Sequence, residues 1–279
     1  MKRFVFSDLA CENERNGNKS MAEELRWGIK RQCFSERYNG GSVKYVTYFA
    51  DRFGNIDNDA FYMLQKSIAG DIADLIKQNC NIDKIDHNIS ILVVGLGNSH
   101  LTPDSLGCET VKLISATHHL GRAQIEKLKL SDVSTVIPDV TGNTGIETVE
   151  LVKATVSCIK PNVVIIVDSL ASKSVDRLAS TVQLSTNGIT PGSGISRTRK
   201  TIDSNTLGVP IISVGVPTVV NSATLMADVL KDKIGENDME KIMSVLRNHT
   251  GFFVTPKEID IIIEDSALLL SGAIKMALK

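Results

Sequence analysis

The chain has 279 residues, 42% of them hydrophobic and 23% charged, so it can bury a large core and is neither a disordered nor a collagen-like chain. Its 31 Lys and Arg against 32 Asp and Glu give a net charge of -1, which excludes a general electrostatic attraction to nucleic acid or to a membrane surface. The five cysteines are scattered without a Cys-x-x-Cys pair, which favours reduced thiols over a disulfide framework or a zinc ribbon.

The N-terminal sequence MKRFVFSDLACENE does not have the form of a signal peptide, because acidic residues occur before a long apolar run accumulates. No later apolar run is long enough to span a bilayer. We therefore expect a cytoplasmic protein with no membrane partner and no nucleic-acid partner.

Two helices and a strand are predicted in the first 80 residues. The S-x-x-E spacing of Ser20 and Glu23 is that of a reciprocally capped helix start, and it predicts a helix over residues 20–31. β-branched and aromatic residues predict a strand at 42–49. Apolar residues at intervals of three to four then predict a second helix, through Met63, Ile68, Ile72, Leu75 and Ile76.

From residue 89 onward, short apolar runs alternate with helical patterns, which is typical of strands buried on both faces of a sheet. The runs are ISILVVGLG, NVVIIVDS and VPIISVGVP. Helices are predicted from Pro103, from Thr144 with Glu147 as its capping partner, and from Thr255 to the C-terminus. This alternation predicts an α/β fold, a three-layer α/β/α domain with a mainly parallel or mixed sheet.

Two aspartates follow buried strands of this predicted sheet. Asp104 is expected in the first turn of a helix, and Asp168 where the strand NVVIIVD ends. Ligands of open α/β sheets bind outside the carboxyl ends of the strands, so both side chains are expected at one edge. On neighbouring strands, about 4.8 Å apart, the two carboxyl groups would share one proton and provide an acid and a base for attack of water on a peptide bond.

Each aspartate also has a structural interpretation. An aspartate in the first turn of a helix, such as Asp104, is favoured by the helix dipole. One at the end of a strand, such as Asp168, is a common turn former. Position at the functional edge of the sheet favours catalysis without deciding the question.

Two glycine-containing loops could bring backbone close to a ligand. The first follows a strand, but the third glycine of a dinucleotide fingerprint is replaced by His100, so we expect no nucleotide cofactor and assign substrate binding or loop support to Gly95, Gly97 and Asn98. The second, ITPGSG, is either an oxyanion nest or a simple turn, and its candidate residues are Gly192, Ser193 and Gly194.

The histidines do not form a metal-binding pattern. His118 and His119 are adjacent, so on a helix they project about 100° apart and cannot readily bind one ion. His100 could act as a ligand near Asp104, although a hydrogen-bonding role is commoner. No serine has the G-x-S-x-G context of a nucleophile elbow. We expect neither a metal nor a cofactor.

Several segments together resemble the germination protease family of spore-forming bacteria. They occur in the family's order over most of residues 90 to 275, and they are GLGNSHLTPDSLG, TGIETVELVKA, NVVIIVDSLAS, DRLASTVQLS, GITPGSG, TLGVPIISVGVPTVV and VTPKEIDIIIEDSALLLSGAI. The resemblance implies an atypical aspartic endopeptidase that degrades small acid-soluble spore proteins during germination. Its two essential aspartates correspond to Asp104 and Asp168. It also implies a homotetramer in the spore core, with a phosphorylase/hydrolase-like fold similar to hydrogenase maturation proteases.

Near the N-terminus, FSDLACE resembles the processing site of the family's zymogen, which is itself similar to the sequence cut in the substrate. We therefore predict cleavage between Asp8 and Leu9, a propeptide at 1–8, and a single peptidase domain at 9–279. The chain departs from the family in its short leader, in the Ser-His after GLGN, and in a short stretch between VPTVV and VTPKE.

Three other functions are compatible with parts of the pattern. A hydrogenase maturation protease would share the fold and use a metal, but it would be much shorter. Peptidyl-tRNA hydrolase shares GLGN but not the residues expected around it. A non-catalytic relative would bind spore proteins without cutting them, and the presence of both aspartates argues against it.

Overall fold

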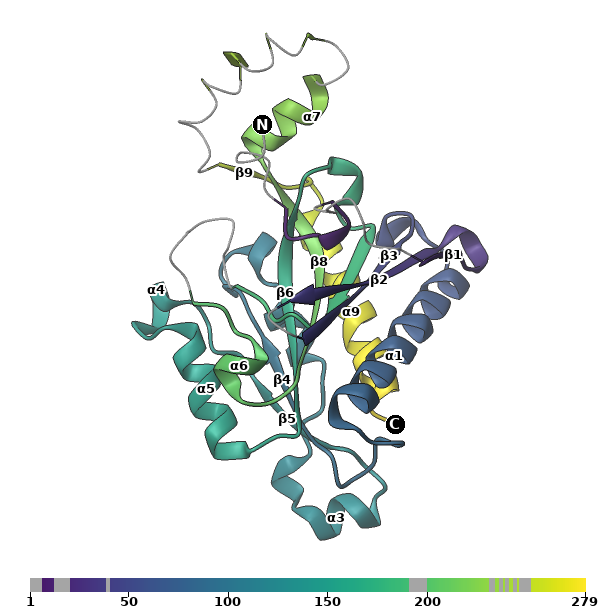
Figure 1. Cartoon of the computed structure of the whole chain (residues 1–279), viewed down its shortest axis with the longest axis vertical. Helices are drawn as coiled ribbons and strands as arrows, with labels where there is room; N and C mark the ends of the chain where they lie inside the picture. Colours follow the sequence, from purple (N-terminus) through teal and green to yellow (C-terminus); the bar gives the residue numbers. More distant parts are fainter. Residues whose placement is uncertain are drawn as a thin grey trace.

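The protein folds around one large mixed β-sheet (Figure 1). The computed structural model describes residues 7–12, 21–38, 41–190, 200–230, 234–235, 238, 241–242, 245 and 252–279. In this part of the chain the sheet has nine strands in the order β1-β2-β3-β7-β8-β6-β4-β5, with β9 pairing β8. The strands are β1 (Met21–Glu24), β2 (Lys30–Tyr38), β3 (Gly41–Phe49), β4 (Ser90–Gly95), β5 (Asp132–Val136), β6 (Val163–Ser172), β7 (Thr181–Ser185), β8 (Ile211–Asn221) and β9 (Phe253–Val254).

The sheet has a parallel half and an antiparallel half. Strands β5, β4, β6 and β8 run parallel to one another, as the three apolar runs predicted. Strand β7 pairs antiparallel with β8 on one side and with β3 on the other, and β2 and β1 continue the antiparallel half. Strand β7 is therefore the junction between the halves, and the fold is α/β with a mixed sheet.

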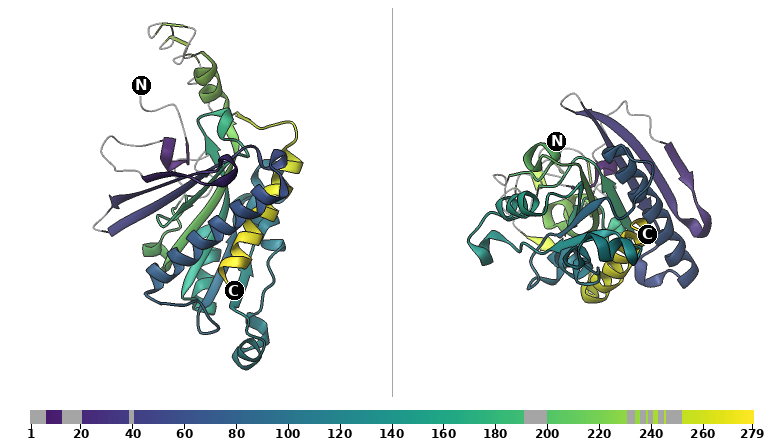
Figure 2. Two further views of the ribbon diagram at one scale, coloured as in Figure 1. Left: turned by 90° about the vertical axis from the view of Figure 1, so that its right-hand side faces the viewer. Right: turned by 90° about the horizontal axis from the view of Figure 1, so that it is seen from below.

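Helices cover both faces of the sheet. The helices of the described ranges are α1 (Asn58–Cys80), α2 (Leu106–Lys112), α3 (Arg122–Lys127), α4 (Thr141–Thr144), α5 (Thr148–Ile159), α6 (Ser204–Leu207), α7 (Ser222–Leu230) and α9 (Ile259–Ala277). On one face α1 and α9 lie side by side, with α2 against α9 (Figure 2). On the other face α5 and α6 pack against β4 and β6. The result is the predicted three-layer α/β/α arrangement.

Alternation along the central strands explains why two cores form. In β6, Val163, Ile165 and Val167 join the core under α1 and α9. The residues between them, Val164 and Ile166, join the core under α5. Successive strand residues point to opposite faces, so a strand buried on both faces is apolar at most of its positions.

The predicted helix over residues 20–31 is wrong. Within the described residues this stretch forms β1, the short 3-10 helix η2 (Arg26–Gly28) and the start of β2, while Ser20 lies outside them. Met21 pairs with Cys33 in the antiparallel ladder, and its side chain is 79% exposed. Pairing with a long strand outweighs the capping pattern, which by itself is a weak local signal.

Other helix boundaries differ from the prediction by a few residues. The helix expected from Thr144 begins at Thr148, because Gly145 adopts a left-handed φ of 72° and ends the short helix before it. The C-terminal helix begins at Ile259, since the hydroxyl of Thr255 donates to the carbonyl of Thr218 instead of capping a helix. The predicted strand at 42–49 and the helix through Met63 and Ile76 are confirmed as β3 and α1.

No helix in the described ranges combines the length and the apolar character needed to cross a lipid bilayer.

Candidate active site

Asp168 is a buried carboxyl group in the middle of strand β6. The apolar run predicts Asp168 at the end of the strand, but β6 pairs with β8 as far as Ser172 and is therefore longer than predicted. Asp168 is 7% exposed, and one carboxyl oxygen accepts a hydrogen bond from the N–H of Ser169 at 2.9 Å. Burial raises the pKa of Asp168 well above its usual range, and the negative charges of Asp104 and Asp8 raise it further. Asp168 therefore favours its protonated form.

Asp104 ends the 3-10 turn η4 (Thr102–Asp104) that follows β4. The N–H of Asn98 donates to the Asp104 carboxylate at 3.0 Å and to its backbone carbonyl at 3.1 Å. Gly97 makes this approach possible: its φ is +110°, and a Cβ there would lie 1.8 Å from the Asp104 carbonyl oxygen. The GLGN loop thus holds Asp104 through backbone groups. Because β4 and β6 are neighbours, it brings Asp104 near Asp168.

Of the first loop's predicted residues, Gly95 and Gly97 allow close packing and Asn98 supports the loop. A Cβ on Gly95 would lie 2.2 Å from the carbonyl oxygen of Gly107 in α2, so this glycine lets the helix pack directly on the strand. The Asn98 side chain accepts a hydrogen bond from the N–H of His100. The predicted residues of the second loop, Gly192, Ser193 and Gly194, lie outside the described residues.

An irregularity in β8 supports the Asp104 turn from the other side. Between β6 and β8 the register shifts, so that Leu170 faces Pro217 and Ala171 faces Val219. The extra residue is Thr218, which is fully buried and whose hydroxyl donates to the carbonyl of Pro103 at 2.7 Å. Bulges redirect side chains in this way. Here one connects β8 to the residue before Asp104.

The N-terminal segment 7–12 lies against the C-terminal end of β6 (purple, Figure 1), and the charge of its Asp8 is near enough to raise the pKa of Asp168. The N–H of Asp8 donates to the carbonyl of Ala171 at 2.9 Å, and the N–H of Ala171 donates to the Asp8 carboxylate at 2.8 Å. Leu9 has no exposed surface. Asp8, the predicted processing residue, is therefore docked at the predicted catalytic pair.

Glu12 anchors the same segment at its other end. Its carboxylate accepts from the N–H groups of Lys173 and Ser174, at 2.7 and 3.3 Å, and from the hydroxyl of Ser7. The Lys173 ammonium donates to the Glu12 carbonyl at 2.6 Å. The segment is thus bound on both sides of the Asp8–Leu9 bond.

Gln183 in β7 is one of the polar residues of this site that the sequence patterns did not single out, as are Glu12 and Thr218. Gln183 is 8% exposed, and its amide nitrogen donates to the Asp8 carbonyl at 3.1 Å. Its amide oxygen accepts from the N–H of Ala10 at 2.6 Å. The alternation of polar and apolar residues in TVQLS was the available signal, because it predicts a strand that puts Thr181, Gln183 and Ser185 on one face.

Two further reactive side chains, the Cys108 thiol and the His118 imidazole, are unsuited to catalysis at the aspartate pair. Burial raises the pKa of the Cys108 thiol to about 11, with a further contribution from Asp104, so it remains protonated and poorly nucleophilic. His118 contacts Asp132, away from the aspartate pair in sequence and in the sheet. Within the described ranges, His, Cys, Asp and Glu side chains do not gather in groups of three or more suited to a metal ion.

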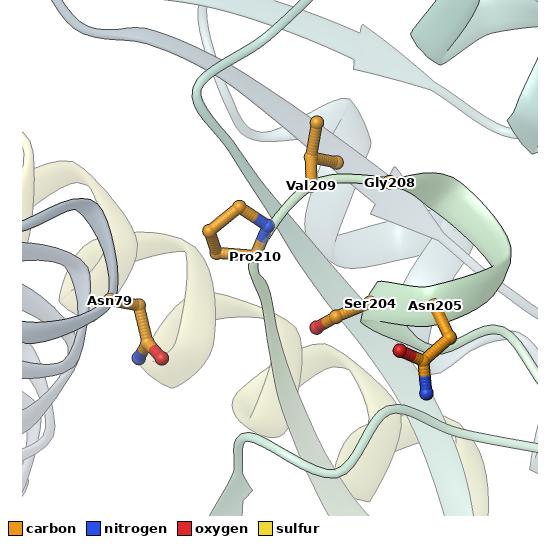
Figure 3. Close-up of a pocket in the computed structure, with 6 residues that line it drawn as sticks. All are labelled: Asn79, Ser204, Asn205, Gly208, Val209 and Pro210. Carbon is orange, nitrogen blue, oxygen red and sulfur yellow. The ribbon is translucent and has the colours of Figure 1, made fainter. Parts of the chain in front are cut away.

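A surface hollow of about 550 Å³ lies at the N-terminal end of β8 (Figure 3). Its lining contains amides, a hydroxyl and small apolar groups but no ionisable side chain, and it consists of Asn79, Ser204, Asn205, Gly208, Val209 and Pro210. Pro210 immediately precedes β8, whereas Gly215 is the β8 residue beside Asp168. This hollow is therefore separate from the aspartate site.

Comparison with known proteins gives one family throughout. The family described as germination protease matches residues 31–241, a range that contains Asp104, Asp168 and Gln183. The germination protease of Caldanaerobacter subterraneus subsp. tengcongensis is 39% identical over 242 residues, covering 77% of this chain and 73% of the relative. That of Clostridium acetobutylicum is 33% identical and covers 98% of this chain and 92% of the relative.

A third relative, the germination protease of Oceanobacillus iheyensis, is 44% identical over 67% of this chain and 50% of its own length. The family match covers the strands and turns that carry both aspartates, while the docked segment 7–12 precedes it. Taken with the fold and the carboxyl pair, these similarities identify the chain as a member of the germination protease family.

Proposed function

We propose that this chain is an endopeptidase that uses Asp104 and Asp168 to activate water, cuts small acid-soluble spore proteins during germination, and is made as a zymogen. The observation that carries the proposal is the position of Asp8. A residue predicted to precede the processed bond lies close enough to Asp168 for its charge to raise the pKa of that group.

The environments of the two aspartates support different roles. Asp104 accepts a backbone hydrogen bond, which favours an ionised carboxylate. Asp168 is buried near other carboxylates, which raises its pKa and favours the acid. In this proposal the pair carries one proton, held mainly by Asp168. Asp104 is the general base and Asp168 the general acid.

The reaction then balances as a hydrolysis. Asp104 takes a proton from water as the water oxygen adds to the carbonyl carbon of the peptide bond. Asp168 gives its proton to the leaving nitrogen as the carbon–nitrogen bond breaks. The products are a carboxylic acid and an amine, and the pair still holds one proton, which returns to Asp168 for the next cycle.

Docking of segment 7–12 supports zymogen control. Asp8 of the segment contacts Ala171 in β6 and Gln183 in β7, and the segment thereby covers the space next to Asp168. A substrate cannot occupy these same backbone and side-chain groups while the segment is bound. We propose that the chain cuts its own Asp8–Leu9 bond and thereby removes residues 1–8. A homotetramer in the spore core belongs to the same proposal.

The test is incubation of the purified full chain with a small acid-soluble spore protein, with and without a chelator. Wild type is expected to cut the substrate and to acquire Leu9 as its N-terminus by mass spectrometry, in both conditions. Asp104→Asn and Asp168→Asn are expected to do neither. Asp71→Asn, at a buried aspartate of α1, is the matched control and is expected to retain both reactions when folded.

Three results contradict parts of this proposal. Activity that survives in Asp104→Asn or Asp168→Asn removes that residue from the mechanism. Loss of cutting with the chelator points to the metal-dependent alternative. Binding of the spore protein without cutting, in every condition, points to a non-catalytic relative.

A further inference from the structure

The docked segment presents one peptide carbonyl to a side chain that the aspartate mechanism does not use. That carbonyl belongs to Asp8, and the donor is the amide nitrogen of Gln183 at 3.1 Å. The Gln183 amide oxygen accepts from the N–H of Ala10 at 2.6 Å. The Gln183 side chain therefore forms hydrogen bonds with the backbone on both sides of Leu9.

The sheet register places Gln183 opposite the acid of the pair. Gly215 of β8 is the register partner of both Asp168 in β6 and Gln183 in β7. Register partners point to the same face, so Asp168 and Gln183 face the same side two strands apart, roughly 10 Å between backbones. The residue between them has no side chain, and the backbone of segment 7–12 bridges this interval, from Ala171 to Gln183.

Gln183 is the largest polar side chain of this fully buried strand. Val182 and Leu184, its neighbours in β7, belong to the core under α1 and α9, whereas Gln183 faces the opposite side. Among the described residues, the polar contacts of its amide are with the docked segment. A buried amide costs free energy unless it is hydrogen-bonded, and here a bound peptide backbone supplies both partners.

We propose that Gln183 binds the substrate backbone and polarises the carbonyl of the bond to be cut, as the donor that stabilises the oxyanion when water adds. This inference rests on the proposed function, because it takes Asp8–Leu9 as that bond. A preorganised donor acts on the charge that develops on this oxygen, and losing one such donor typically slows hydrolysis by about 100-fold or more. The contact with Ala10 positions the chain and does not depend on side-chain identity in the substrate.

The variant that separates the two contacts is Gln183→Glu. A glutamate keeps an acceptor for the Ala10 N–H but, when ionised, offers no donor to the Asp8 carbonyl. Gln183→Met keeps the length and removes both contacts. Gln124→Glu, at an exposed position of α3, is the control for added charge. Each variant is made in the full chain, and the first-order rate of Asp8–Leu9 cleavage is measured by mass spectrometry from pH 4 to 8.

The expected result at neutral pH is a loss of about 100-fold in Gln183→Glu and in Gln183→Met, and none in Gln124→Glu. At low pH the protonated glutamate regains an O–H donor, so the rate of Gln183→Glu relative to wild type recovers, while that of Gln183→Met does not. A purely structural role would not produce this difference. Hydrogen exchange at Ala10 is expected to remain slow in Gln183→Glu and to become fast in Gln183→Met.

Failure of this inference is distinguishable from failure of the proposed function. If wild type cuts Asp8–Leu9 but both Gln183 variants cut within threefold of it, or if both lose activity equally at every pH, Gln183 is not the donor. If wild type does not cut this bond, or Asp168→Asn cuts it normally, the proposed function itself fails. If Gln183→Glu unfolds, the comparison of Gln183→Met with Gln183→Asn decides, since only the latter retains an amide donor.

Discussion

Two buried aspartates in this molecule have opposite surroundings. Asp71 in α1 is 9% exposed and Asp168 in β6 is 7% exposed. The guanidinium of Arg31 binds both carboxylate oxygens of Asp71, at 2.6 and 2.8 Å, and the Tyr48 hydroxyl donates to the same group. Asp168 instead lies near two further carboxylates, Asp104 and Asp8. The two carboxyl groups are almost equally buried, while the charges of their neighbours are opposite.

In the proposed mechanism this difference separates a structural carboxylate, Asp71, from a catalytic one, Asp168. At Asp71 the hydrogen bond with the carboxylate raises the pKa of Arg31, and burial together with Asp71 raises the pKa of Tyr48, so each donor keeps its proton. That cluster ties the antiparallel strands to α1. At Asp168 burial and the neighbouring carboxylates disfavour the charged form, and in the proposed mechanism the proton that this group retains is the one given to the substrate.

Replacing each aspartate by asparagine is the most direct test of the different roles of Asp71 and Asp168. Asp168→Asn is expected to reduce peptide cleavage by about 1,000-fold while the protein stays folded, since proton transfer typically contributes about 100- to 10,000-fold. Asp71→Asn is expected to lower the free energy of unfolding by about 2 kcal/mol, below the range for a fully buried pair because 22% of the Arg31 side chain is exposed. Cleavage assays and urea denaturation on both variants measure the two effects, and equal effects on activity would remove the distinction.

The second prediction concerns the loop that brings Asp104 near Asp168. Gly97→Ala places a methyl group 1.8 Å from the Asp104 carbonyl oxygen, so the turn has to move. Displacement of a reacting group by about 1 Å costs about 100-fold in rate. Gly142→Ala is the control, because its Cβ would meet no atom within 4 Å. Normal activity in Gly97→Ala would show that the position of Asp104 is not critical.

The third prediction uses pH to compare the two aspartates. Because the folded-state pKa of Asp168 is raised above 3.8, the folded protein holds a proton that the unfolded chain has released once the pH exceeds this value. Wild type is therefore expected to lose stability as pH rises through that window, by up to about 1.4 kcal/mol per pH unit. Asp168→Asn lacks this loss, so its stability relative to wild type rises with pH. Well below pH 3.8 Asp168 is protonated in both the folded and the unfolded protein, so it adds no pH dependence to the free energy of unfolding.

Urea denaturation at several pH values between 3 and 8 checks this prediction. Parallel curves for wild type and Asp168→Asn would mean that Asp168 has the same pKa in the folded and unfolded states.

The smallest expected effect is at Thr218. Thr218→Val removes the hydroxyl that donates to the Pro103 carbonyl and leaves this acceptor unpaired, which costs about 1 kcal/mol and is expected to lower activity about fivefold. Thr110→Val in α2 is the matched control, because the buried hydroxyl of Thr110 has no hydrogen-bond partner among the residues that the structure describes. Thr110→Val is expected to be neutral or stabilising. If Thr218→Val is neutral as well, the bulge does not support the Asp104 turn.

Much of the fold followed from local sequence patterns, because the apolar runs of β4, β6 and β8 are dense and unbroken. The same patterns predicted that Asp104 and Asp168 would lie at one edge of the sheet. What they could not predict depends on long-range pairing. Strand β1 replaces a predicted helix because it pairs with β2, and β6 continues past Asp168 because β8 extends beside it.

The missed glutamine shows a limit of a different kind. Gln183 has no local motif, and its partners are backbone groups of residues 8 and 10, more than 170 positions earlier in the chain. Only the register of β6, β8 and β7 puts it opposite Asp168. Periodicity could have predicted which face it occupies, but not what covers that face.

If the Asp8–Leu9 bond is cut as proposed, the anchoring of Glu12 affects how quickly the mature enzyme becomes active. Glu12 lies on the C-terminal side of the Asp8–Leu9 bond, so cutting that bond would leave its contacts with Lys173 and Ser174 in place. The newly formed ammonium group of Leu9 would then remain next to the two aspartates, where its positive charge is attracted to them and its residue blocks the site. In this proposal, maturation and the first turnover of an added substrate are separate events, and the lag expected between them measures how long the new terminus takes to leave.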